Sequence, residues 1–315
     1  MVEVKNLTKH FKIKKNNFFK SPEIVKALDG IDFSIPKGKT FGLVGESGSG
    51  KTTAARSLLR LIEPDKGEIK IDGQRVDLLI RKDLKRFRKK TQLVFQDPYS
   101  SLNPRMTVGN IIAEPIKIEG RTSQTERQKR LQELVSLVGL QTDHLERYPH
   151  EFSGGQRQRI GIARAIALNP KFIVLDEPVS ALDVSIQAQI LNLLADLQEK
   201  MDLTYLFVAH DLAVVKHMSD KIAVMYLGKI VEENTKEELY HKPLHPYTQN
   251  LLKSIPKIKV EKKILSFSGE IPSPENPPAG CHFHPRCPQA KPLCQQKYPE
   301  MKSVGKGRVA CFLYS

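Results

Sequence analysis

Short, predominantly apolar runs occur at three places in the chain, residues 40–44, 172–175 and 203–209. Runs of this length are typical of parallel strands that are covered on both faces. Residues 31–35 instead alternate polar and apolar side chains, as expected for a strand with one exposed face, and a Pro-Lys-Gly turn follows them. The pattern predicts a sheet core, with further short strands at residues 2–4, 67–73, 91–96 and 225–232.

Helical spacing replaces the strand pattern in the middle of the chain. Within residues 124–140 the apolar positions that repeat at helical spacing are Leu131, Leu134, Val135 and Val138. Within residues 157–168 the same spacing recurs at Ile160, Ala163, Ile166 and Ala167. We therefore expect a mostly helical insertion, over about residues 97–165, inside an α/β domain. The basic and polar segment from Lys9 to Lys26 is expected to be an exposed loop.

The most specific chemical signal is Gly45-Glu46-Ser47-Gly48-Ser49-Gly50-Lys51-Thr52, which follows a predicted strand and precedes a helical segment beginning at Thr53. It matches the phosphate-binding pattern G-x-x-x-x-G-K-[ST] at every fixed position. The glycines let backbone N–H groups point inward, so that the loop and the helix N-terminus can hold a chain of phosphates. Lys51 is expected to reach the β- and γ-phosphates of ATP, and Thr52 to coordinate Mg²⁺.

The apolar run at residues 172–175 leads into two adjacent acids, Asp176 and Glu177. Neighbouring side chains of a strand point to opposite faces, so the two acids cannot share one role. Asp176 is the better candidate to hold Mg²⁺ and its water shell together with Thr52. Glu177 is the better candidate for the general base that polarises the attacking water.

Three further features could complete a nucleotide site. Gln96 ends a predicted strand, and its amide oxygen could contact the metal and sense the γ-phosphate. Phe11 could stack on an adenine ring, and a purely structural phenylalanine is the alternative. Ser153 can cap the helix that follows it, while Gly154 and Gly155 leave backbone N–H groups open, which predicts a second anion site.

Together these motifs resemble the ATP-binding cassette (ABC) ATPases. The resemblance rests on motifs in the family's order, namely Gly45 to Thr52, Gln96, Phe152-Ser153-Gly154-Gly155-Gln156, Leu175-Asp176-Glu177-Pro178, Ser180-Ala181-Leu182-Asp183 and His210. Phe152 departs from the leucine that usually begins the signature motif. The resemblance implies an α/β fold: a P-loop NTPase cassette over residues 1–235, with a mixed sheet core, an antiparallel β subdomain and the inserted helical subdomain.

The same resemblance implies a mechanism in which two cassettes meet head to tail. Ser153, Gly154, Gly155 and Gln156 would then act on the nucleotide of the partner, and Asp183 would cross the dimer seam. His210 would touch the γ-phosphate and hold the water of Glu177 in line. Binding of ATP brings the two cassettes together and hydrolysis releases them, because the γ-phosphate contacts exist only before hydrolysis.

Length and hydropathy narrow the class of protein. The chain has 315 residues, enough for one large or two modest domains. It contains no apolar run of about 18 residues, the length that a membrane-spanning helix needs. The N-terminal residues lack the apolar core of a signal peptide, so the chain is expected to stay in the cytoplasm.

The net charge of +15 is concentrated in part at residues 81–90, where seven cations accompany one anion. Such a run is a solvated helix face, a nucleic-acid surface or a site near anionic lipid headgroups. A soluble ABC ATPase acting on nucleic acid or ribosomes is therefore the alternative function. Such proteins usually carry two cassettes or a long coiled coil, and neither is present in this sequence.

All four cysteines of the chain lie in its last 35 residues, at Cys281, Cys287, Cys294 and Cys311. A reducing cytoplasm disfavours disulfides, so four thiolates binding Zn²⁺ or a 4Fe-4S cluster are the alternatives. The spacing lacks the C-x₂-C pair that is common in zinc sites and therefore favours a cluster. His282 and His284 are alternative ligands. The low apolar content of the tail suggests a structural role for such a site.

A second resemblance covers this tail, residues 236–315, which we expect to be a small irregular C-terminal extension. Pro243 to Thr248 and Gly280 to Pro288 are similar to the extension of the ATPase subunits of bacterial dipeptide and oligopeptide importers, particularly the second ATPase of the pair. That resemblance implies a 4Fe-4S cluster on the four cysteines.

The expected function is thus the energy-coupling ATPase of a peptide importer, peripheral on the cytoplasmic face of the membrane. The resemblance implies a second ATPase subunit, identical or a sister chain, and two membrane-spanning permease subunits. An extracytoplasmic peptide-binding protein would act indirectly, and no nucleic acid is expected. The choice among dipeptides, oligopeptides and other small solutes such as nickel stays open, because other chains of such a transporter select the substrate.

Overall fold

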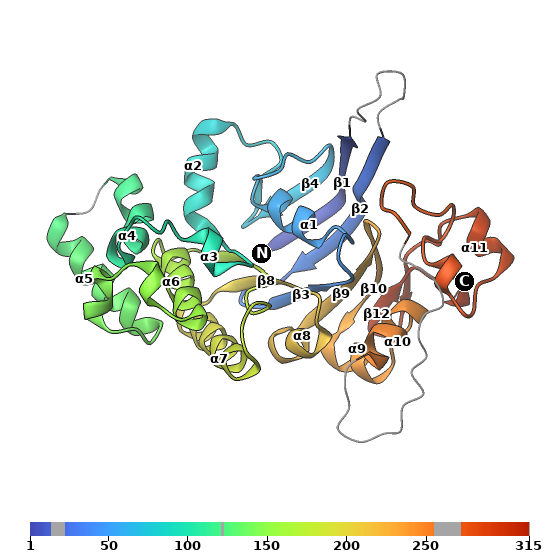
Figure 1. Ribbon diagram of the computed structural model, residues 1–315. Coiled ribbons are helices and arrows are strands. Elements are labelled where there is room, and N and C mark those ends of the chain that lie inside the picture. Colours follow the sequence, from blue (N-terminus) through green and yellow to red (C-terminus); the bar gives the residue numbers. More distant parts are fainter. Residues whose placement is uncertain (14–22, 121–122, 255–271, 315) are drawn as a thin grey trace. The chain divides into compact units, whose positions relative to one another are not determined.

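The computed structural model describes residues 1–13, 23–120, 123–254 and 272–314. The chain forms two compact units. Figure 1 colours the chain by residue number, from blue at the N-terminus to red at the C-terminus. The first unit comprises Met1, Ile35–Thr40 and Leu78–Val208, and the second comprises Val2–Ser34, Phe41–Asp77 and Ala209–Ser315. In sequence, the main segment of the first unit, Leu78–Val208, is therefore inserted between two segments of the second.

The second unit contains an antiparallel sheet in the order β2-β1-β4-β5. Its strands are β1 (Val2–Ile13), β2 (Glu23–Ile35), β4 (Lys66–Ile71) and β5 (Gln74–Arg75). Val2 and Val4 of β1 and Ile69 and Ile71 of β4 are buried, at the two-residue spacing that a strand requires. The prediction of a loop from Lys9 to Lys26 is wrong at both ends, and residues 14–22 lie outside the described part. The polar end of β1 is extended because the backbone N–H of His10 donates to Asp65 at 2.6 Å.

Five further strands of the second unit are hydrogen-bonded to their neighbours in the order β11-β12-β10-β9-β3, as part of a mixed sheet. The strands are β3 (Thr40–Val44), β9 (Lys221–Tyr226), β10 (Lys229–Thr235), β11 (Lys302–Val304) and β12 (Gly307–Val309). β3 pairs with β9 in parallel, whereas β9, β10, β12 and β11 pair antiparallel in succession. The predicted strand-turn-strand near residues 225–232 is thus confirmed, and the end of the chain adds a hairpin to the same sheet.

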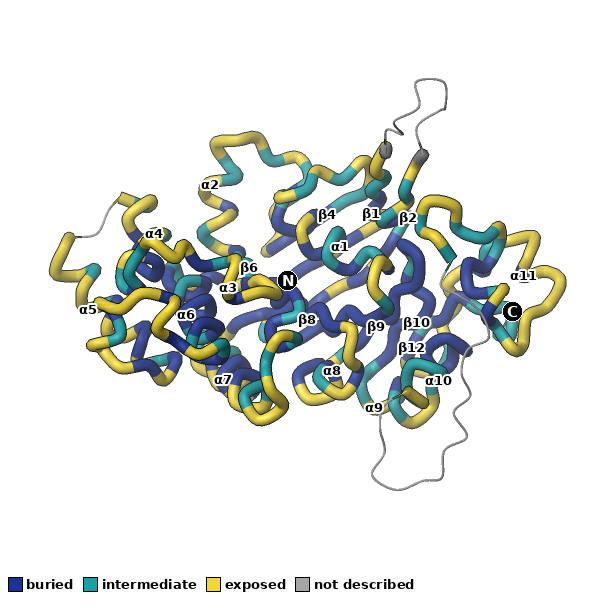
Figure 2. The backbone as a smooth tube through the Cα atoms, in the orientation of Figure 1, coloured by how far each residue is buried: buried dark blue, intermediate teal, exposed yellow. Residues whose placement is uncertain are grey.

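The helices of the second unit are short, and each has at least one buried side chain. They are α1 (Lys51–Leu58), α8 (Leu212–Met218), α9 (Lys236–His241), α10 (Pro246–Lys253) and α11 (Pro292–Gln296), with single helical turns at His284–Arg286 and Phe312–Tyr314. α1 begins at Lys51, so its first two residues are the last two of the phosphate-binding pattern, and the strand-loop-helix order matches the one predicted from the sequence. Figure 2 shows the buried backbone of β3, β9 and β10 in dark blue.

The first unit contains the parallel strands β6 (Thr91–Val94), β7 (Phe172–Asp176) and β8 (Thr204–Ala209), with β7 in the middle. Every residue of β7 and β8 is buried, which confirms the two apolar strands predicted there. The helices are α2 (Arg81–Lys90), α3 (Pro98–Ser101), α4 (Val108–Glu119), α5 (Gln124–Leu137), α6 (Gly154–Ile166) and α7 (Val184–Met201), with 3₁₀ turns at Thr142–Glu146 and Pro149–Glu151.

The predicted helical insertion is confirmed by α3 to α6, which pack together in this unit (Figure 1). The apolar positions predicted for α5 and α6 are all buried. The basic run at residues 81–90 forms α2, of which Phe87 is the buried side chain, so its cations occupy an exposed helix face as one alternative proposed. Among the described residues, no helix combines the length and apolarity required to cross a bilayer.

The connection from β10 to α10 buries two ionisable side chains. The carboxylate of Glu232 accepts the backbone N–H groups of Leu244 and His245 at 2.9 and 2.8 Å. His245 is 1% exposed, and its Nδ1 accepts the N–H of Tyr247 at 3.1 Å, which caps α10. Burial raises the pKa of Glu232 above its ordinary value and lowers the pKa of His245 to about 3. The cap therefore requires a neutral imidazole.

Replacing His245 with Asn should reduce the loss of stability in mild acid. Unfolded histidine binds a proton below about pH 6.5, whereas folded His245 stays unprotonated. Between about pH 7.5 and about pH 5.5, this difference lowers the unfolding free energy of the wild type by about 1.4 kcal/mol. The stability difference between wild type and His245→Asn should narrow by this amount when urea unfolding is measured at about pH 7.5 and pH 5.5. The exposed His217→Asn is the control, and an equal narrowing there would contradict the assignment.

Candidate functional site

The phosphate-binding loop joins the end of β3 to α1, and its backbone lies against two other strands. Gly45 has φ 156°, and a Cβ atom there would lie 2.2 Å from the carbonyl oxygen of Met225. Gly50 has φ 106°, and a Cβ atom would lie 2.1 Å from the carbonyl oxygen of Ala27. Both distances exclude any side chain. The loop therefore takes a defined shape, and the glycines are required by contact as well as by conformation.

Lys51 is buried under this loop, with 4% of its surface exposed. Its ammonium donates to the carbonyl oxygens of Gly45 and Glu46 at 2.7 and 2.9 Å, and Ser49 Oγ lies at 3.4 Å. Gly50 caps α1 without a side-chain hydrogen bond, so the helix N-terminus lacks a side-chain acceptor of its own. A buried cation together with an uncapped helix N-terminus fits the phosphates of a nucleotide.

The remaining residues of the phosphate-binding loop also belong to the second unit, and so does Phe11, the residue predicted to stack on adenine. Thr52 and Thr53 lie in the first turn of α1, and Ser47 and Gly48 are exposed at the tip of the loop. A Cβ atom at Gly48 would meet no other atom within 4 Å, so the tip faces open space. Phe11 lies on β1, 37% exposed, and the ammonium of Lys9 is 5.5 Å from its ring centroid.

The acidic pair and Gln96 lie in the first unit. Asp176 is the last residue of β7 and is 4% exposed. Glu177 follows it with φ 49°, a left-handed conformation that is rare for this residue, and its N–H donates to the carbonyl of Val208 at 2.9 Å. Gln96 Nε2 donates to Glu177 Oε2 at 2.9 Å. The structure thus places Gln96, the predicted metal contact, next to Glu177, the predicted general base. The left-handed conformation of Glu177 ends the extended backbone of β7.

The second anion site predicted at Ser153 is the N-terminus of α6. Ser153 Oγ accepts the N–H of Gln156 at 3.4 Å, and Gln156 Oε1 accepts the N–H of Ser153 at 3.0 Å, which confirms the predicted cap as a capping box. A Cβ atom at Gly155 would lie 2.4 Å from Ile186 Cγ2, and one at Gly154 would lie 3.3 Å from a methyl group of Leu182. The start of α6 therefore packs closely on the start of α7.

Asp183 and His210 each lie at the end of a regular element. Asp183 is the N-cap residue of α7 in the first unit, and it is exposed. His210 follows β8, is exposed and belongs to the second unit. The phosphate loop and Phe11 lie in the second unit too, whereas Gln96, Ser153 to Gln156 and the acidic pair lie in the first.

A glycine-rich loop between a buried strand and a helix, with a buried lysine inside it, defines a P-loop nucleoside triphosphatase. Residues 28–180 match the ABC transporter family, and residues 231–294 match the oligopeptide/dipeptide transporter C-terminal region. The chain is 52% identical to the oligopeptide transport ATP-binding protein AppF of Bacillus subtilis (strain 168), covering all of this chain and 98% of that protein. It is 46% identical to the di/tripeptide transport ATP-binding protein DppF of Pseudomonas aeruginosa, covering 99% and 97%.

A solved structure agrees with these relatives. The dimeric post-hydrolysis state of the ATP-binding cassette MJ0796 bound to ADP and Pi superposes with a TM-score of 0.67 and 32% identity, covering 75% of this chain and 99% of that chain. The chain belongs to the ABC transporter ATP-binding proteins, in the group of oligopeptide and dipeptide transport ATPases. The predicted cassette fold and ATPase class are confirmed, and the nucleic-acid alternative has no support.

The predicted 4Fe-4S cluster is wrong, and zinc has no support either. The four cysteines are free thiols that line one small cavity, but among the described residues no group of three or more His, Cys, Asp or Glu side chains could hold a metal ion. The names of the relatives mention no cluster. Burial raises the pKa of Cys281 to about 12 and also raises the pKa of Cys287 and Cys311. His282 and His284 each contact a backbone carbonyl oxygen. Cys281 and Cys294 are buried, and Cys287 and Cys311 are half-buried.

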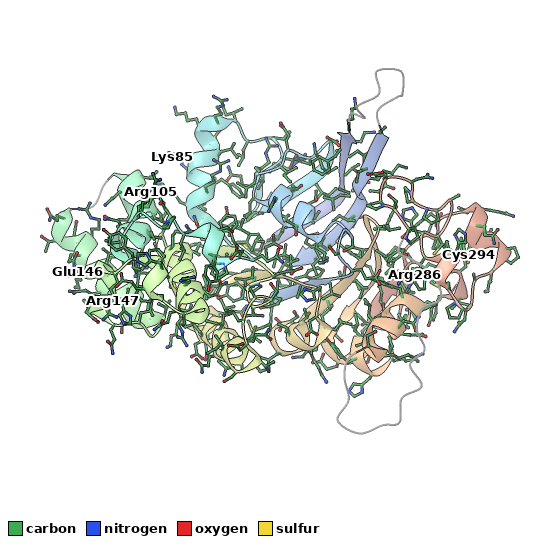
Figure 3. All side chains as sticks on the ribbon, viewed as in Figure 1. Lys85, Arg105, Glu146, Arg147, Arg286 and Cys294 are labelled. Carbon is green, nitrogen blue, oxygen red and sulfur yellow. The ribbon has the colours of Figure 1, made fainter. Side chains whose placement is uncertain are left out.

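Sequence reasoning missed two residues that contact the phosphate loop. The hydroxyl of Tyr247 accepts the N–H of Glu46, and the guanidinium of Arg286 pairs with the carboxylate of Glu46. They lie 201 and 240 residues along the chain from Glu46, so no local pattern marks them. Figure 3 labels Arg286 and Cys294 in the C-terminal part of the chain.

Replacing Gly155 with Ala should destabilise the first unit by about 1–3 kcal/mol, because the new methyl group overlaps the branched side chain of Ile186. Gly161 of the same helix is the matched control. A Cβ atom there meets nothing within 4 Å, so Gly161→Ala should stabilise by about 1 kcal/mol through helix propensity. Guanidinium unfolding curves of both variants test the contrast, and similar stability of the two would contradict the packing described for α6.

Proposed function

We propose that this chain is the ATP-hydrolysing, energy-coupling subunit of a dipeptide or oligopeptide importer. The observation that carries the proposal is the pairing of a complete cassette with a C-terminal region of the oligopeptide/dipeptide transporter type in one chain. The relatives that match over the full length are named as peptide transport ATP-binding proteins. A position on the cytoplasmic face of the membrane is part of the proposal, because ATP and the permease meet there.

The roles proposed for the ATP site follow from the local chemistry. The backbone of Gly45 to Thr53 cradles the phosphates, Lys51 neutralises the β- and γ-phosphates, and Phe11 supports the base. Mg²⁺ supplies charge neutralisation between the phosphates, and Thr52, Asp176 and Gln96 are the residues proposed to hold it.

Glu177 is proposed as the general base and His210 as the residue that senses the γ-phosphate. The 2.9 Å hydrogen bond from Gln96 and the left-handed backbone support this role for Glu177, because they keep its carboxylate in one orientation after a buried strand. A carboxylate held this way can accept a proton from water as it attacks.

The working unit is proposed to be a head-to-tail pair of such ATPases, either two copies of this chain or this chain with a sister. Ser153, Gly154, Gly155 and Gln156 would contact the nucleotide of the partner, and Asp183 would lie at the seam. The uncharged, glycine-bearing N-terminus of α6 supports this role, because it presents backbone N–H groups and a helix dipole to an anion.

Two membrane-spanning permease subunits complete the proposal, with an extracytoplasmic peptide-binding protein acting through them. The surface proposed to contact the permease is residues 96–114. Tyr99 lies in this segment and is 63% exposed, and Phe95, which directly precedes the segment in sequence, is 40% exposed, which suits a partner of mixed polarity. We propose domain limits of 1–235 for the cassette, about 97–165 for its helical part and 236–315 for the C-terminal extension.

Replacing Glu177 with Gln should abolish turnover while leaving ATP binding intact. The amide cannot accept the proton of the attacking water, so the hydrolysis rate should fall by about 10²- to 10⁴-fold. Steady-state phosphate release and equilibrium binding of ATP, measured on the same preparation, separate the two effects. The exposed Glu199→Gln on α7 is the control and should hydrolyse ATP at the wild-type rate. Hydrolysis that persists undiminished in Glu177→Gln would remove the general-base assignment.

Mixing two inactive variants tests the head-to-tail pair. Lys51→Met disables the phosphate loop of its own chain, and Ser153→Arg disables the surface offered to the other chain. If two copies pair head to tail, the mixed dimer contains one intact composite site, and activity should reappear on mixing. Phosphate release is measured for each variant alone and for the mixture. A mixture as inactive as its components would argue against pairing of identical chains and in favour of a sister ATPase.

A further inference from the structure

One residue of the phosphate loop, Glu46, is bound by the C-terminal region at two of its polar groups. Arg286 Nη1 donates to Glu46 Oε2 at 2.9 Å and Arg286 Nη2 donates to Oε1 at 3.0 Å, a bidentate pair. The backbone N–H of Glu46 donates to the hydroxyl of Tyr247 at 2.9 Å. Because all three residues belong to the second unit, these contacts lie within one compact body.

The groups that bind Glu46 are themselves fixed. The side chain of Arg286 is 6% exposed, and its Nη1 also donates to the hydroxyl of Tyr226 at 3.3 Å. Tyr226, Tyr247 and Phe283 form one aromatic cluster, with ring centroids 4.7 to 5.4 Å apart. Burial raises the pKa of Tyr247, which keeps its hydroxyl protonated, and the hydrogen bond to Glu46 raises the pKa of Arg286. Arg286 and Tyr247 therefore hold Glu46 rigidly, and the guanidinium of Arg286 stays charged at neutral pH.

The carboxylate of Glu46 would be unfavourable beside a nucleotide without these contacts. The carbonyl of the same residue accepts the ammonium of Lys51, so Glu46 lies next to the cation that is to receive phosphates. An unpaired negative charge there would repel an anion and attract Lys51. The guanidinium of Arg286 neutralises the carboxylate of Glu46, and the hydroxyl of Tyr247 accepts the backbone N–H of Glu46.

We propose that the C-terminal region braces the phosphate loop, with Arg286 and Tyr247 as positioning residues that act on ATP through Glu46. The inference rests on the proposed nucleotide site and deepens it. It makes nucleotide affinity depend on how the C-terminal region is docked. The C-terminal region would thus have a function of its own, which is to set the affinity of the chain for ATP.

The test is equilibrium binding of fluorescent ATP and ADP analogues to the full chain, with Mg²⁺, together with the KM and kcat of hydrolysis. Arg286→Met should weaken ATP binding about tenfold, because it leaves a partly buried carboxylate unpaired near an anion. The loss should be smaller for ADP, which carries less charge. KM should rise while kcat changes little. Adding Glu46→Gln to Arg286→Met should restore most of the ATP affinity, since the unpaired charge is gone.

A matched control is available in the same region. Arg308 pairs with the buried carboxylate of Glu233 at 2.5 Å, so Arg308→Met also breaks an ion pair of the C-terminal region, but one that does not involve the phosphate loop. It should lower the melting temperature without changing the ratio of ATP to ADP affinity. Tyr247→Phe removes a single hydroxyl and should raise the Kd for ATP about threefold. It decides the question if Arg286→Met does not fold.

The outcomes separate this inference from the proposed function. If Lys51→Met abolishes ATP binding while Arg286→Met and Tyr247→Phe bind ATP as tightly as Arg308→Met, the brace does not exist but the nucleotide site stands. If Lys51→Met binds ATP normally, the proposed site itself fails. If Glu46→Gln fails to rescue Arg286→Met, charge compensation is overturned.

Discussion

The nucleotide-binding half of the molecule depends on a close approach of backbone to backbone. The phosphate loop passes so near the carbonyl oxygens of Ala27 and Met225 that no side chain fits between them. Those two carbonyls come from different sheets of the same unit, so the loop has its shape only when both sheets are assembled. The buried ammonium of Lys51 then satisfies carbonyl oxygens that the tight loop turns inward. Close packing, the conformations of the glycines and the charge of Lys51 thus together determine the structure of the eight residues of the loop.

In the first unit, hydrogen bonds to neighbouring residues hold a functional side chain in place. Its buried strand β7 ends in the carboxylate of Asp176, and Glu177 adopts a left-handed backbone conformation directly after it. Such a conformation costs of order 1–3 kcal/mol and persists only where the surroundings hold it. Here the N–H of Glu177 bonds Val208 and its carboxylate bonds Gln96. Both units therefore place reactive groups on the ends of rigid strands and hold them with neighbouring backbone.

Sequence patterns predicted those features that depend on neighbours in the chain. The apolar run that forms β7, the phosphate loop and the cap formed by Ser153 with Gln156 are all encoded within a few residues. The contacts of Glu46 with Tyr247 and Arg286 could not be predicted, because side-chain periodicity carries no information about which distant segment packs against a loop. The cysteines misled for a related reason: thiols that are close in sequence occur in metal sites and in small apolar cores alike. The polar end of β1 was mistaken for a loop, since its partner Asp65 lies 55 residues away.

The hairpin at the end of the chain has a consequence for biosynthesis. β12 pairs with β10 through Glu232 and Glu233 opposite Val309 and Arg308, so the mixed sheet gains its outer strands from residues that are translated after all of the predicted ATP-binding motifs. A nascent chain that has emerged only as far as β10 presents that strand as an open edge, with a buried-type carboxylate at Glu233 still lacking Arg308. Premature termination between the codons for β10 and β12 would thus yield a product whose exposed strand edge favours aggregation, although every predicted ATP-binding motif had already been made.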